Sequence, residues 1–192
     1  MQKTDESEAR ADQSILGGAP WALDPIKPEL MDEPIEYFFA EHYRQRQAAD
    51  ALILVANGEY DKQGVERLIN FLERDYARHV GDEEVGFFPL LRQQCIPEDN
   101  IESLIKRLCD EHKNEENIGK DVLALLKELQ TGATMSVEKK RKLRVFAEHT
   151  RQHLAVENAV LLPIARVRMD EGSLKALSVI LKQRYADEDS ER

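Results

Sequence analysis

Apolar residues recur every three or four positions in four long stretches of the chain, which is the spacing that places them on one side of an α-helix. The stretches run from residue 32 to 57, from 62 to 90, from 101 to 130 and from 136 to 169. Short segments such as Asn57-Gly58 and Thr131-Gly132 separate them. Because short connections favour antiparallel neighbours, the pattern predicts an all-α fold, an up-down-up-down four-helix bundle.

The two ends of the chain lack this long-range pattern. Residues 1–31 are polar at first and then interrupted by prolines and glycines, so we expect a disordered tail followed by an extended N-terminal arm. Residues 32–170 are the predicted bundle domain. For residues 171–192 we expect a short fifth helix, carried by Leu174, Leu177 and Ile180, and then a charged tail.

Composition narrows the classes of partner. The net charge of −10 argues against nucleic acid or an anionic membrane as the main partner. No apolar run approaches the roughly 20 residues that a membrane-spanning helix needs. Two cysteines, Cys95 and Cys109, form no disulfide framework, and we see no signal peptide, so we expect the protein to be cytoplasmic. The sequence leaves open whether the protein forms a homodimer.

All five histidines fall on predicted inward faces, with at least one on each long helix. Three of them are followed by a glutamate four residues later, which is about one helical turn and therefore the same face. Buried imidazoles and carboxylates are costly unless something pairs with them, and a metal ion would pair with both. The candidate metal ligands are His42, His79, Glu83, His112, Glu116, His149, His153 and Glu157.

Two of these candidates have open alternatives. Glu115 could serve in place of Glu116, or neither could serve. His149 is either a fifth imidazole ligand or a group that hydrogen-bonds a ligand. Taken singly, a histidine and a glutamate one turn apart are more often a surface pair or a satisfied core histidine. The metal interpretation depends on their occurrence together on four helices.

The donor types and a repeated sequence motif indicate the kind of metal site. A proline follows the glutamate by six residues in both Glu83–Pro89 and Glu157–Pro163. Mixed imidazole and carboxylate donors suit iron, zinc or manganese rather than calcium or magnesium. The donors are too many for one tetrahedral ion, and they suit two ions roughly 3.5–4 Å apart.

These motifs resemble those of the haemerythrin-like family, the His/His/Glu cation-binding domains, over residues 32–170. The matching motifs are Glu41-His42, His79-x-x-x-Glu83 with Phe87-Phe88-Pro89, Glu111-His112, and His153-x-x-x-Glu157 with Leu161-Leu162-Pro163. The resemblance implies a four-helix bundle with a non-haem di-iron centre. It also implies that the histidines of the four motifs are terminal ligands, and that Glu83 and Glu157 bridge the irons.

The chain departs from the oxygen carriers of that family, which have a second histidine at the position of Glu116 and an aspartate in place of Glu157. These differences argue against reversible oxygen carriage. We therefore expect a protein that holds two iron ions, with zinc or manganese as alternatives, and binds or senses O2, NO or iron. The other hypotheses are a di-iron enzyme that acts on peroxide or another small oxidant, and a metal-free bundle that acts as an interaction module.

Overall fold

The computed structural model describes residues 23–190, and every regular element within them is a helix. The all-α prediction is thereby confirmed for the described part of the chain. The predicted disordered tail and most of the predicted arm fall in residues 1–22, outside the described residues. Residues 23–27 have no regular structure, and a short 3-10 helix, η1 (Pro28–Asp32), follows them.

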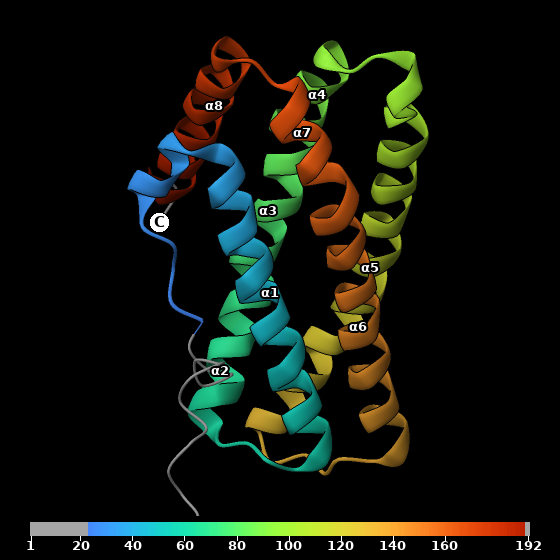
Figure 1. The fold of residues 1–192 in the computed structure, drawn as a ribbon. Coiled ribbons are helices and arrows are strands. Elements are labelled where there is room, and N and C mark those ends of the chain that lie inside the picture. Colours follow the sequence, from blue (N-terminus) through green and yellow to red (C-terminus); the bar gives the residue numbers. More distant parts are fainter. Residues whose placement is uncertain (1–22, 191–192) are drawn as a thin grey trace, which may run out of the picture.

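Four long helical segments make up the body of the molecule (Figure 1). The first and third are the single helices α1 (Pro34–Asn57) and α5 (Ile101–Gln130), the latter preceded by the 3-10 turn η4 (Pro97–Asp99). The second segment comprises α2 (Lys62–Asn70), η2 (Phe71–Tyr76), α3 (Ala77–Gly81), η3 (Asp82–Phe87) and α4 (Phe88–Gln94). The fourth comprises α6 (Val137–Val156), η5 (Glu157–Leu161) and α7 (Leu162–Arg168).

Local chemistry accounts for the ends of these helices. The Asp61 side chain accepts a hydrogen bond from the Gly64 backbone N–H, and Ser136 does the same for Lys139, so each caps a helix that begins one residue later. Gly58 and Gly132 both adopt a φ of 90°, a left-handed conformation that costs glycine little, and they end α1 and α5.

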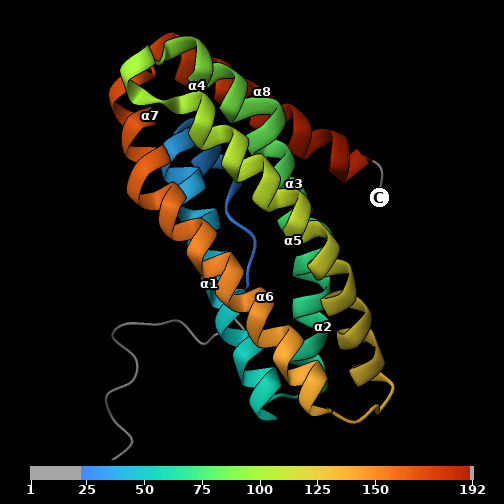
Figure 2. The same cartoon turned by 90° about the vertical axis from the view of Figure 1, so that its right-hand side faces the viewer.

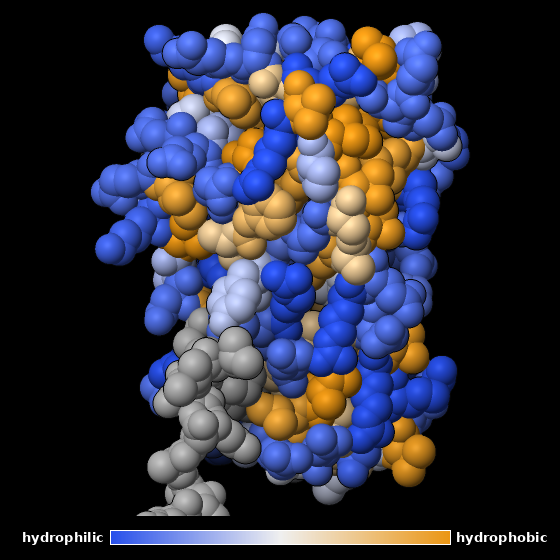
Figure 3. Space-filling view, viewed as in Figure 1, coloured by the Kyte–Doolittle hydropathy of each residue, from blue (hydrophilic) through white to orange (hydrophobic). Residues whose placement is uncertain are grey.

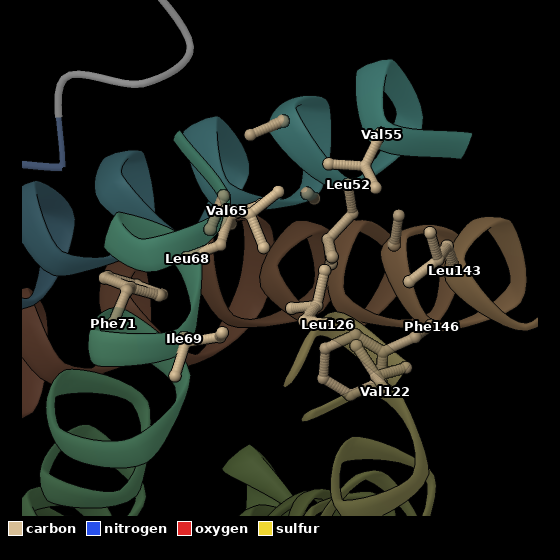
Figure 4. Packing of buried hydrophobic residues seen from close by; sticks show 14 of the residues in the cluster. Leu52, Val55, Val65, Leu68, Ile69, Phe71, Val122, Leu126, Leu143 and Phe146 are labelled. Carbon is tan, nitrogen blue, oxygen red and sulfur yellow. The ribbon is translucent and has the colours of Figure 1, made fainter. Parts of the chain in front are cut away.

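The hydrophobic core has two parts. One lies among α1, α2, α5 and α6 and includes Leu52, Leu68, Leu126 and Phe146 (Figure 4). The other, at the opposite end of the long segments, is formed by residues such as Phe38 and by parts of α4, α7 and α8. Along each long segment, buried polar residues lie in the sequence between the residues of the two parts. The core therefore encloses a polar layer near the middle of the molecule.

The fifth helix differs from its prediction. It runs from Glu171 to Ser190 as α8, 20 residues, and so extends through the region expected to be a charged tail. Charged side chains hold it to the bundle: Arg184 binds Asp82, and Glu188 lies 3.6 Å from Arg78. Gly86 of η3 lets α8 approach closely, since a Cβ there would lie 3.1 Å from Ile180. Figure 2 shows α8 against the outside of the second segment.

The molecular surface is largely polar. On the face seen in Figure 3, apolar side chains gather over the upper part around α7, and Val160 and Val167 are among the exposed apolar residues. Among the described residues, no helix combines the length and the apolar character needed to cross a membrane.

Asp82 provides a test of how α8 is attached. Its carboxylate is buried and accepts hydrogen bonds from Arg184 at 2.7 Å and from the Tyr37 hydroxyl at 3.2 Å. Burial raises the pKa of Asp82 to about 6. The folded protein therefore retains this proton to higher pH than the unfolded chain, so its stability falls as the pH rises from about 4 to about 6.

We expect Asp82→Asn to remove this part of the pH dependence. The amide oxygen still accepts from Arg184, while a difference of about 2 kcal/mol in the free energy of unfolding between pH 4 and pH 6 disappears. Urea unfolding of the metal-free protein at several pH values measures the free energy of unfolding. The variant Asp121→Asn, at an exposed position, is the control. If Asp82→Asn keeps the pH dependence of the parent protein, the buried carboxylate is not its source.

Candidate metal centre

Six of the eight predicted ligands come together in the polar layer between the two parts of the core. All six are buried, and Glu83, Glu157 and His42 are fully enclosed. They are supplied by all four long segments: His42 by α1, His79 by α3, Glu83 by η3, His112 by α5, His153 by α6 and Glu157 by η5. Residues far apart in the sequence thus converge on one place.

The six residues divide into two overlapping groups of four. His42 and His79 form one group with Glu83 and Glu157, and His112 and His153 form the other with the same two glutamates. Within each group, one potential ligand atom per residue lies within 4.8 Å of every other. The two carboxylates are therefore shared, while each pair of imidazoles belongs to one group.

The distances show how the Glu83 carboxylate is shared. Its Oε1 lies 3.6 Å from His42 Nε2 and 3.5 Å from His79 Nε2. Its Oε2 lies 3.2 Å from His112 Nε2. One oxygen of Glu83 thus faces each group.

The Glu157 carboxylate is divided in the same way. Its Oε2 lies 3.4 Å from His42 Nε2, and its Oε1 lies 3.0 Å from His153 Nε2. Two carboxylates that each present one oxygen to either side can bridge a pair of metal ions.

Three of the four imidazoles are oriented through their outer nitrogen. The Nδ1 atoms of His42, His112 and His153 lie 2.9, 2.8 and 2.9 Å from oxygens of other side chains. The oxygens belong to Asn158, Glu84 and Glu111, respectively. An imidazole that donates from Nδ1 keeps the lone pair of Nε2 for a metal, and metal-bound histidines in proteins commonly have such a partner.

The helical spacing of the histidines and glutamates does not predict these orienting roles. Asn158 and Glu84 directly follow the two shared glutamates in the sequence, and Glu111 directly precedes His112. A polar residue next to a buried ligand on a helix was therefore the signal available.

Several polar atoms of the cluster are buried without a hydrogen-bond partner. Both oxygens of Glu83 and of Glu157, Nε2 of His42 and both ring nitrogens of His79 lack a well-aligned hydrogen-bond partner among the described residues. Unpaired buried polar groups are costly, and a cation placed among them would remove that cost. The donor set, borderline imidazole nitrogens with carboxylate oxygens, fits iron, manganese or zinc.

Burial and mutual charge also separate the pKa values within the cluster. Burial lowers the pKa of His79 to about 3. Burial would also lower the pKa of His153, but the Glu157 carboxylate beside it raises that pKa to about 10. Burial and the charge of Glu83 raise the pKa of Glu157. In the metal-free protein His153 is therefore protonated at neutral pH, and a metal ion that binds its Nε2 would displace that proton.

Two π-helical turns carry Glu83 and Glu157, the glutamates common to both groups. The Phe88 N–H bonds to the Glu83 carbonyl and the Leu162 N–H to the Glu157 carbonyl, both five residues back. A proline, Pro89 or Pro163, directly follows the residue that donates each of these bonds. Proline has no N–H to donate, and its ring crowds the preceding turn. The helix widens for one turn and continues, and such turns occur often at functional sites.

Glu116 is not brought into the cluster. It is exposed and accepts a hydrogen bond from Lys120 at 2.7 Å, so the prediction that placed it with the ligands does not match its position. Its neighbour Glu115 is buried instead and accepts a hydrogen bond from the Tyr76 hydroxyl. Successive residues of an α-helix are rotated by about 100° around its axis, which is enough for one of them to be buried and the next exposed.

His149 also lies outside both groups of ligand atoms. It is half-buried and lines a separate cavity of about 150 Å³ with Arg107, Gln152 and the outer side of His153. It precedes His153 by one turn on α6. The structure shows no hydrogen bond from His149 to a ligand among the described residues.

Comparison with known proteins agrees with this geometry. A family model described as the hemerythrin HHE cation-binding domain matches residues 33–165, which is more than half of the chain and includes all six clustered residues. No curated protein matches the chain. The chain therefore belongs to the hemerythrin HHE cation-binding domain family.

Proposed function

We propose that this protein holds a pair of iron ions and uses them to bind or sense O2, NO or iron. The observation that carries the proposal is that Glu83 and Glu157 are common to two four-residue groups, each completed by two imidazoles. The proposal includes the up-down-up-down arrangement of the four long segments. Figure 1 supports that arrangement, since successive segments run in alternating directions.

In this proposal the residues have distinct roles. His42 and His79 would hold one ion, His112 and His153 would hold the other, and Glu83 and Glu157 would be shared by both. Each ion then has four protein donors. Four donors satisfy zinc in a structural site, whereas iron commonly takes six and would keep positions for a small ligand. This difference favours iron over zinc.

The protein groups around the cluster determine what can reach it. When bound, the iron pair supplies coordination of small ligands and one-electron chemistry. Asn158, Glu84 and Glu111 hold three imidazoles so that Nε2 faces the cluster. Phe38 and Phe88 pack beside the imidazoles and reduce the access of bulk water, which strengthens the electrostatic interactions inside.

Iron content and an absorption spectrum of the aerobic protein, purified without chelators, test the proposal. We expect about two irons per chain and a near-ultraviolet band from an oxygen-bridged ferric pair. Addition of NO to the reduced protein should change the spectrum. Substoichiometric metal after iron-replete expression would contradict the proposal. Steady-state turnover of hydrogen peroxide above that of free iron would instead favour the enzyme hypothesis.

A further inference from the structure

A cavity of about 530 Å³ lies beside the candidate metal centre, between η2 and α3 on one side and α5 on the other. Its lining includes His112, which is also a member of the metal-binding cluster. A diatomic ligand occupies little more space than a water molecule, roughly 30 Å³. The cavity is therefore far larger than O2 or NO requires, and its volume lies in the range typical of sites for organic ligands.

The walls of the cavity are mainly apolar and partly aromatic. They include Leu72, Tyr76, Val80, Leu123 and Phe146. The Tyr76 and Phe146 rings meet edge to face, with centroids 6.2 Å apart. Aromatic rings arranged in this way favour a flat apolar guest, because a further ring can pack against them in the same manner.

The π-helical turn η2 gives a second, independent observation. The other two π-helical turns each precede a proline, but η2 (Phe71–Tyr76) contains none and none follows it closely. Its residues Leu72, Glu73 and Tyr76 line the cavity. A widened turn without a proline to cause it, located at a cavity, is typical of a ligand site.

The polar groups of the cavity indicate the charge of the guest. Four glutamates line it, Glu73, Glu84, Glu115 and Glu116, against two lysines, Lys113 and Lys120. An anion is therefore disfavoured. At the inner side, the Tyr76 hydroxyl bonds to the buried Glu115 carboxylate, which has further acceptor capacity for a hydroxyl of the guest.

We propose that this cavity binds a neutral aromatic molecule of one or two rings that carries a hydroxyl group, with the hydroxyl directed at Glu115. The guest would lie against His112 and thus next to the metal centre without being a metal ligand. Binding requires no metal, so the inference stands or falls separately from the proposed function.

Calorimetric titration with 2-naphthol at neutral pH tests the proposal, on both metal-free and iron-loaded protein. Gly119→Leu should fill the cavity at little structural cost, because a Cβ at Gly119 meets only the Phe146 ring, at 3.6 Å. Ala77→Leu fills it from the opposite wall. We expect 2-naphthol to bind the parent protein and to bind each of these variants at least tenfold more weakly.

Two comparisons make the test specific. Ala124→Leu adds the same side chain to an exposed position of α5 outside the cavity and should leave binding unchanged. The anion 2-naphthoate should bind the parent protein at least tenfold more weakly than 2-naphthol. Absence of 2-naphthol binding, equal binding by the filled variants, or equal binding of naphthoate would each overturn the proposal. Metal-free protein that binds 2-naphthol but takes up no iron would support this inference and contradict the proposed function.

Discussion

Replacement of Glu157 by alanine is expected to lower the iron content of the purified protein from about two ions per chain to one or none. Glu157 Oε2 lies 3.4 Å from His42 Nε2, and Oε1 lies 3.0 Å from His153 Nε2, so the substitution removes a donor from both groups at once. The loss of a terminal imidazole would affect one ion directly, whereas the loss of a shared carboxylate affects both.

The same substitution should not unfold the metal-free protein. Both Glu157 oxygens are buried without a well-aligned hydrogen-bond partner, so their removal relieves a desolvation cost that partly offsets the space left behind. Elemental analysis together with circular dichroism separates metal loss from unfolding. Glu83→Ala should likewise lose iron without unfolding. Glu116→Ala, at an exposed position, is the matched control. A normal iron content in Glu157→Ala would remove this residue from the ligand set.

Metal loading is expected to raise the unfolding temperature by on the order of 10 °C. The cluster places two carboxylates and four imidazoles in the protein interior. A cation binds the folded cluster but not the dispersed residues of the unfolded chain. A ligand at a thousand times its Kd stabilises by about 4 kcal/mol, and each kcal/mol is worth about 2–4 °C for a chain of this size.

Differential scanning calorimetry with and without Mn²⁺ measures this shift without the redox chemistry of iron. The Glu83→Ala/Glu157→Ala double variant should lose most of the shift, while Glu116→Ala should retain it. If the double variant is stabilised as much as the parent protein, the metal binds elsewhere.

The spacing of the candidate ligands along the chain was sufficient to predict that most of them converge. His79–Glu83 and His153–Glu157 each span one turn on a strongly amphipathic segment, so a shared buried face follows directly from the helical period. The same argument predicted Glu116 as a ligand, with Glu115 or neither residue as the alternatives, and the structure places Glu116 at the surface. α5 contains no π-helical turn. Glu116 lies on the exposed side of this helix, where it accepts a hydrogen bond from Lys120, one turn later in the sequence.

Other features depend on tertiary contacts that periodicity does not report. The charged residues after Leu181 resemble a solvated tail, yet Arg184 reaches the buried Asp82 and thereby extends α8 along the bundle. The orienting role of Asn158 depends on the position of His42, 116 residues earlier in the chain. Such pairings become evident only once the helices are packed.

Anomalous diffraction from crystals of the iron-loaded protein, recorded at the iron absorption edge, would locate the metal ions themselves. We expect two peaks roughly 3.5–4 Å apart, both within bonding distance of Glu83 and Glu157. One peak should lie beside His42 and His79, and the other beside His112 and His153. Iron peaks confined to the molecular surface, or a single peak that leaves one pair of imidazoles without metal, would contradict this expectation.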